Sequence, residues 1–184
     1  MQRLSALFVG AVIGTVFIFL SVNESLSSSL AIVLRVLAAV ALTSVVVMWL
    51  LGVKVAQSGG ALRAEPNAAE GFFGRRYVLV VVAAEAALLF AGLTLLRNWS
   101  LPEQVNMAWL AFMAGVHFVA FAPVWRERGL LIPGVVLILI GVAGFALAAA
   151  TALECVPVAS GVLTGVTILA GSAAYSWRTL TSMR

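Results

Sequence analysis

The chain contains six apolar segments, and each is long enough to cross a lipid bilayer as an α-helix. They span approximately residues 4–21, 30–51, 77–96, 105–124, 129–150 and 156–177. A hydrocarbon core of ~30 Å needs about 20 helical residues. Hydrophobic residues make up 63% of the chain and charged residues only 10%, which suits a protein whose main solvent is lipid. The sequence therefore predicts an all-α fold, a polytopic bundle of six transmembrane helices forming a single domain over residues 1–184.

The basic residues gather in alternate connections between these segments. One side of the membrane would hold Arg3, Lys54, Arg63, Arg75, Arg76, Arg126, Arg128, Arg178 and Arg184. The opposite side would hold only Arg97. Because cytoplasmic loops carry an excess of Lys and Arg, we expect both termini and the loop over 52–76 to be cytoplasmic in a multi-pass protein of the cell membrane.

Aromatic residues support the same boundaries, since Trp and Tyr prefer the two membrane–water interfaces. Five of them fall at predicted cytoplasmic ends: Trp49, Tyr77, Trp125, Tyr175 and Trp177. Trp99 and Trp109 are expected to mark the outer side.

The first apolar segment is expected to be retained as a transmembrane helix rather than cleaved as a signal peptide. Its apolar run, Leu4 to Leu20, is longer than the usual 7 to 15 residues of a signal peptide. The sequence after it, Asn23 to Ser27, offers no clear small-x-small cleavage site.

Several classes of partner and site are disfavoured by the composition. The net charge of +4 is spread over topology-determining loops rather than in a continuous stripe, so no nucleic-acid partner is expected. Cys155 is the only cysteine, which excludes an intramolecular disulfide and a Cys-rich metal site. One His and one intramembrane Glu are too few ligands for a metal ion, and no cofactor is expected.

Two ionisable residues, Glu85 and His117, fall near the middle of adjacent segments. Glu85 lies eight residues, ~12 Å, from the cytoplasmic start of its helix, and His117 lies seven residues, ~10 Å, from the cytoplasmic end of the next. The spacing predicts a Glu–His pair if the two faces converge. Such a pair can shuttle a proton, or it can be a structural hydrogen bond between helices. We expect function, because intramembrane ionisable groups are costly and normally mark functional sites.

Arg35 is the third ionisable residue within a span, about five residues, ~7 Å, below the outer surface. Its long side chain can reach outward to the interface without a partner, which is the favoured interpretation. Alternatively, it points inward toward Glu85, where it would bind an anionic group together with a bridging substrate or water.

The last segment carries small and polar residues along one helical face. Ser160, Thr164, Thr167 and Gly171 recur at i, i+4, i+7 and i+11. This pattern favours close packing, with the hydroxyls bonded to their own helix backbone, and the alternative is the lining of a polar cavity. Gly10 and Gly14 form a GxxxG motif, which also allows close helix approach.

Part of the chain resembles a family of small bacterial integral membrane proteins with six helices and no assigned activity. The similar stretches are Gly74-Arg75-Arg76-Tyr77, Ala84-Glu85, Leu101-Pro102-Glu103, Trp109 and Gly115-Val116-His117-Phe118. The resemblance implies a bacterial inner membrane location and a joint importance of Glu85 and His117. Pro123 stands later than the proline of the family pattern, so we expect the fourth helix to end differently.

Three hypotheses follow from these residues. The first is a protein that binds or transports a small, lipophilic or weakly polar molecule, with Arg35, Glu85, His117, Ser160, Thr164 and Thr167 as substrate-binding residues. The second is a membrane-embedded isomerase or terpene-cyclase-like enzyme, in which Glu85 and His117 would be the catalytic acid–base pair. The third is an accessory subunit, working in a homo-oligomer or with a membrane protein partner, in which the polar residues only pack helices.

Overall fold

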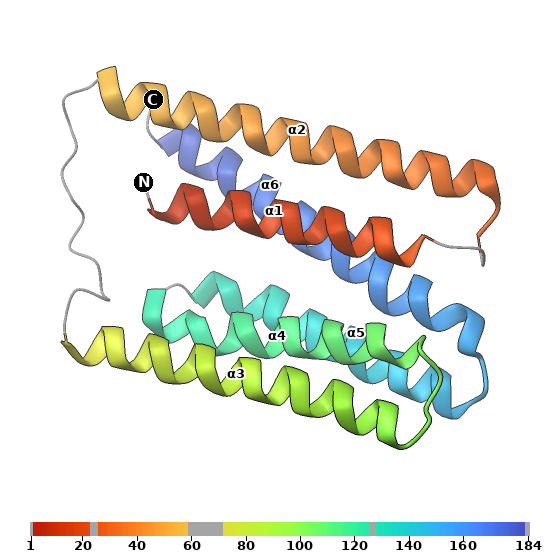
Figure 1. Cartoon of the computed structure of the whole chain (residues 1–184). Helices are drawn as coiled ribbons and strands as arrows, with labels where there is room; N and C mark the ends of the chain where they lie inside the picture. Colours follow the sequence, from red (N-terminus) through yellow and green to blue (C-terminus); the bar gives the residue numbers. More distant parts are fainter. Residues whose placement is uncertain (1, 23–25, 59–71, 126–127, 183–184) are drawn as a thin grey trace. The chain divides into compact units, whose positions relative to one another are not determined.

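The computed structural model describes residues 2–22, 26–58, 72–125 and 128–182, and these residues form helices and turns without a β-strand. The six α-helices are α1 (Gln2–Ser21), α2 (Ser28–Ser58), α3 (Phe72–Asn98), α4 (Val105–Trp125), α5 (Leu131–Ala149) and α6 (Leu163–Ser182) (Figure 1). This confirms the predicted all-α fold.

Apolar stretches within the described residues are long enough to span a membrane at five places. These are Ser28–Leu51, Arg76–Asn98, Val105–Pro123, Leu131–Ala149 and Leu153–Arg178. Helix α1 contributes a shorter apolar stretch, Gly10–Ser21. The protein is therefore a multi-pass membrane protein.

Two helices extend beyond their predicted ends into the expected loop over 52–76. Helix α2 continues to Ser58, and α3 already begins at Phe72. The apolar spans themselves, Ser28–Leu51 and Arg76–Asn98, begin and end within two residues of the predicted segments. Helix α2 continues past its span because residues 53–58 contain no Gly or Pro that would stop a helix. Helix α4 contains Pro123 in its last turn and ends at Trp125, close to the predicted boundary.

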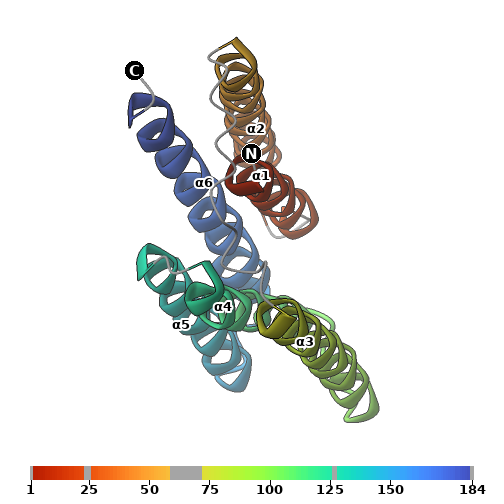
Figure 2. The ribbon, with the colours of Figure 1, turned by 90° about the vertical axis from the view of Figure 1, so that its left-hand side faces the viewer.

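The chain divides into two compact units, residues 1–64 with 164–184 and residues 65–163. In the first unit, α1 and α2 lie side by side (Figures 1 and 2). Helix α6 approaches α1 at its glycines: a Cβ on Gly14 would lie 3.0 Å from the Gly165 carbonyl oxygen, and one on Gly10 would lie 3.1 Å from Ser172 Oγ. The GxxxG motif therefore permits the close approach that the sequence predicts.

In the second unit, α4 packs against α5 on one side and α3 on the other (Figure 2). The contact with α5 is the most extensive between helices of the described residues, and glycines line it. A Cβ on Gly141 would lie 2.7 Å from the Phe112 backbone nitrogen, and one on Gly115 would lie 2.6 Å from that of Ile138. Backbone therefore meets backbone across this interface.

A tight turn connects α3 to α4 and makes them antiparallel neighbours. Ser100 has a positive φ of 53°, and the Leu101 backbone N–H donates to the Leu96 carbonyl at 3.1 Å. This six-residue closure is the Schellman arrangement, here with Ser instead of the usual Gly in the left-handed position. The turn sets residues of α3 and α4 at matching depths.

Candidate functional site

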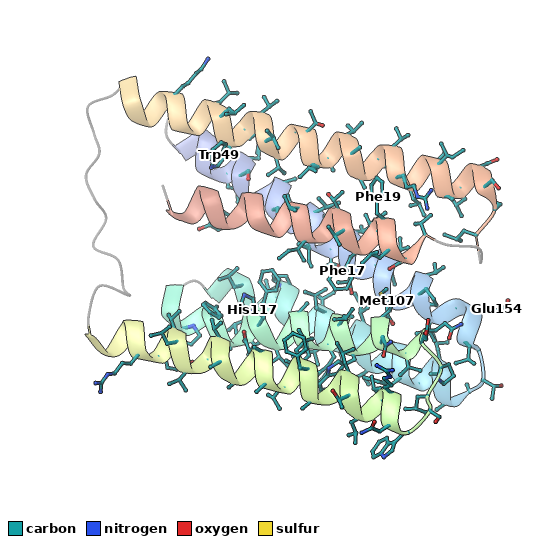
Figure 3. The ribbon with its side chains drawn as sticks, viewed as in Figure 1. Phe17, Phe19, Trp49, Met107, His117 and Glu154 are labelled. Atoms are coloured by element: carbon teal, nitrogen blue, oxygen red, sulfur yellow. The ribbon has the colours of Figure 1, made fainter. Side chains whose placement is uncertain are left out.

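Glu85 and His117 form a direct contact between α3 and α4. His117 Nδ1 and Glu85 Oε2 are 2.7 Å apart, a distance typical of a charge-assisted hydrogen bond. His117 lies on the side of α4 that faces α3 (Figure 3). The depths counted from the sequence predict this pair, and the structure contains it; its role in binding or catalysis stays a prediction.

The two partners differ in exposure. The Glu85 side chain is 14% exposed, whereas the His117 side chain is 49% exposed. Glu85 Oε1 is buried and has no hydrogen-bond partner among the described residues. The carboxyl group is therefore enclosed by protein, while the imidazole is open to whatever lies beside the two helices.

Phenylalanine rings of α4 support the imidazole. The Phe121 ring centroid lies 4.4 Å from that of His117, with the planes tilted by 36°. The Phe118 ring approaches edge-on, with its centroid at 6.2 Å. The half-exposed imidazole is thus flanked by aromatic rings.

Polar contacts on either side of the pair also join α3 to α4. Tyr77 Oη donates to the Ala120 carbonyl at 3.3 Å, and Trp109 Nε1 donates to the Leu89 carbonyl at 3.2 Å. The Trp109 indole also covers Gly92, where any Cβ would overlap the ring. Together these contacts hold Glu85 opposite His117.

Trp109, which the sequence predicts near the outer interface, also packs against other side chains of its unit. Its ring stacks on Phe112 with centroids 5.7 Å apart and meets the Phe145 ring edge-on at 6.5 Å. An indole held among protein rings and bonded to a backbone carbonyl is a packing residue. In the sequence, only Gly92 relates to this arrangement, because a residue without a side chain leaves room for the indole. This role of Gly92 is recognised only when the fold is known.

Arg35 reaches the end of α1. Its Nη2 donates to the Val22 carbonyl at 2.7 Å, and its guanidinium carbon lies 5.9 Å from the centroid of the Phe19 ring. Val22 directly follows α1, so the cation satisfies a carbonyl at a helix C-terminus. The side chain thus extends toward the end of α1 that the sequence predicts to be outer, but it has a backbone partner, whereas the outward interpretation gave it none.

Two hydroxyl groups on the polar face of the last segment, those of Ser160 and Thr164, are buried but not bonded as predicted. Ser160 and Thr164 are both fully buried, and their hydroxyl oxygens have no hydrogen-bond partner among the described residues. The expected bonds to their own helix backbone, which Thr15 and Thr94 do make, are absent from these two hydroxyls. Gly171 has no atom within 4 Å of an added Cβ, so the packed face ends before it.

Ser160 lies in a π-helical segment, Pro157–Val162, that precedes α6. A Cβ on Gly144 of α5 would overlap Ser160 Oγ and lie 2.8 Å from the Ala108 Cβ. Ala108 is nine residues, ~13 Å, from His117 along α4, so Ser160 is not brought to the Glu–His pair. Thr164 and Thr167 belong to the first compact unit, with Arg35.

No group of three or more His, Cys, Asp or Glu side chains suited to a metal ion occurs among the described residues. Comparisons of the chain with protein-family models, with curated proteins and with solved structures found no match. Function is therefore inferred from the geometry of the site.

Proposed function

We propose that this membrane protein binds or transports a small lipophilic molecule at the Glu85–His117 site between α3 and α4. The observation that carries the proposal is the 2.7 Å contact between two ionisable side chains inside apolar helices, with the imidazole 49% exposed. A group that serves packing alone can be fully enclosed, whereas this one presents half of its surface outward. Intramembrane ionisable residues are expensive and normally serve ligand or proton traffic.

A proton-linked mechanism follows from the chemistry of the pair. Histidine titrates near neutrality, and a carboxyl group beside it can exchange the shared proton. Ligand binding at the imidazole would then change with pH, and an affinity that is flat between pH 5 and 8 would remove this part of the proposal.

The test is native mass spectrometry of the purified full-length protein, with analysis of extracted ligands. We expect a small lipophilic molecule in the wild type, lost in Glu85→Gln and in His117→Ala and retained in Glu103→Gln. Glu103 is an exposed carboxylate, so its variant is a matched control for the loss of one charge. An empty wild type with variants that are only less stable would support the accessory role instead.

A second candidate is an acid–base enzyme that acts on a lipophilic substrate, an isomerase or a terpene-cyclase-like protein. The observation in its favour is the direct Glu85–His117 contact, in which the imidazole can return a proton that the carboxyl has donated. Turnover of a lipid extract, followed by product analysis, should be abolished in Glu85→Gln at an unchanged melting temperature. Retained turnover removes this candidate.

The proposal includes an orientation with both termini in the cytoplasm and, through the resemblance of helices three and four, a place in a bacterial inner membrane. Cys155, exposed and expected on the outer side, is a natural probe. A membrane-impermeant maleimide should label it in intact cells. Lys54→Cys in a Cys155→Ser background should be labelled only after the membrane is opened, and the reverse pattern would invert the orientation.

A further inference from the structure

The possible protonation states of Glu85 and His117 limit which ligands can bind to the exposed imidazole. A net charge inside a bilayer is costly, so the pair is most stable in a state without net charge. A neutral state with the proton on Glu85 Oε1 is disfavoured, because that oxygen is buried and has no hydrogen-bond partner among the described residues. Two neutral states with the proton between Oε2 and Nδ1 remain: a carboxylate with an imidazolium, and a neutral carboxyl group that donates its proton to Nδ1. In both states the Glu85–His117 contact uses Nδ1, and in both Nε2 carries a hydrogen.

His117 Nε2 is therefore a hydrogen-bond donor whichever partner holds the shared proton. Among the described residues, His117 makes no hydrogen bond other than the one to Glu85. Neighbouring polar groups are bound elsewhere, since Tyr77 Oη donates to Ala120 and Trp109 Nε1 donates to Leu89. An unpaired N–H in hydrocarbon is unfavourable, so we expect another molecule to supply the acceptor for this donor.

The surroundings define the rest of the ligand. The neighbouring Phe118 and Phe121 rings favour an apolar and preferably aromatic body. A charged ligand would add a net charge to a neutral pair and is disfavoured. Glu85 Oε1 is buried, so the ligand meets the imidazole first.

We propose that the ligand of the Glu85–His117 site is a neutral lipophile with a carbonyl oxygen, which accepts a hydrogen bond from His117 Nε2. This inference rests on the proposed binding function and names the chemical class of its ligand. The acceptor has two sources, a small lipophilic ketone or the ester carbonyl of a membrane lipid. We assign the ketone, because His117 lies eight residues, ~12 Å, from the predicted cytoplasmic end of its helix, deeper than the interface.

The chain offers a clean reporter, because His117 is its only histidine. The test uses the full-length protein with ¹⁵N-labelled histidine in nanodiscs of ether-linked lipid, which has no ester carbonyl. The two probes are decanophenone and decylbenzene, which differ only by a carbonyl in place of a methylene group. Decanophenone should bind about tenfold more tightly than decylbenzene, the scale of one hydrogen bond, and should shift the Nε2 resonance.

Two variants separate this inference from the proposed function. His117→Phe keeps an aromatic ring and removes the donor, so it should bind both probes equally. Glu103→Gln should behave as the wild type. If the two probes bind equally to the wild type and neither binds to Glu85→Met, the binding site is supported. The proposal that its ligand has a carbonyl oxygen is then wrong.

Two further outcomes also count against the proposal. Binding of either probe that is the same in wild type, Glu85→Met and His117→Phe would overturn both the site and its ligand. An Nε2 resonance that shifts only on changing from ether-linked to ester-linked lipid would identify the lipid as the partner and overturn the small-molecule ligand.

Discussion

Helix α4 contacts its two neighbours in different ways. Glycines of both helices line its contact with α5, and at Gly115 of α4 and Gly141 of α5 the backbones themselves touch. Against α3 it makes polar contacts at three levels, to Tyr77, Glu85 and the Leu89 carbonyl. No residue in the most apolar stretch of α3 is fully buried. The α4–α5 contact is a packed core, whereas the α3–α4 contact is a set of separate attachments.

The difference has an energetic and a functional side. Lipid competes for apolar surface, so helices in a membrane associate through close packing and hydrogen bonds, each bond contributing about 0.6 and at most about 1.7 kcal/mol. The α4–α5 contact involves backbone atoms at several levels, so we expect these two helices to separate only as a whole. We therefore expect the α3–α4 interface, which contains the Glu85–His117 site, to separate more easily than the α4–α5 interface, and the proposed ligand would enter there.

The largest expected effect is that of a methyl group added within the packed contact. A Cβ on Gly141 would lie 2.7 to 2.8 Å from Phe112 Cβ and from its backbone nitrogen and Cα. Because backbone atoms cannot swing away, Gly141→Ala should lower the free energy of unfolding by about 1–3 kcal/mol, measured by unfolding in mixed detergent micelles. Gly171→Ala is the control: it meets no atom within 4 Å and should not destabilise.

A smaller effect is expected for the same substitution on the other side of α4. Gly92→Ala places its methyl group in the Trp109 indole, a side chain that can rotate at the expense of its bond to Leu89. The loss should be about 1 kcal/mol, the value of one hydrogen bond, in the same unfolding measurement. A loss as large as that of Gly141→Ala would contradict the view that α3 is loosely attached.

The Glu85–His117 contact should contribute a coupling of similar or smaller size. A double-mutant cycle with Glu85→Ala and His117→Ala should give about 0.6–1.7 kcal/mol, the range for hydrogen bonds between membrane helices. A coupling near zero, together with loss of ligand in both single variants, would assign the pair to binding alone. A coupling well above this range would make it a structural element of the fold.

The sequence predicts the α3–α4 contact better than the α4–α5 contact. Segment number and depth follow from apolar length, and depth was sufficient to place Glu85 opposite His117. The rotation of each helix about its axis cannot be predicted from the sequence. Lipid and the protein interior are both apolar, so no polar face distinguishes the side that faces lipid from the side that faces protein. The inward position of Trp109 and the carbonyl partner of Arg35 both depend on that rotation.

The π-helical segment was also beyond prediction. Pro157 gives a natural helix start, but nothing in the sequence from Pro157 to Val162 distinguishes a π-helical from an α-helical turn. The burial of Ser160 against Gly144 follows from three-dimensional packing with α5. Sequence reasoning therefore found the small residues and the close packing, and missed that the Ser160 and Thr164 hydroxyls would have no partner among the described residues.

The smallest effect is expected at Tyr77, near the predicted cytoplasmic end of α3. Its hydroxyl is exposed and donates over 3.3 Å, longer than the 2.7 to 2.8 Å typical of O–H···O bonds. Tyr77→Phe should therefore cost at most about 0.5 kcal/mol in the unfolding measurement, less than Trp109→Phe, which removes a partly buried bond. The reverse order would show that α3 is held mainly at its Tyr77 end, and a ligand would then have to enter beside Trp109 rather than beside Phe121.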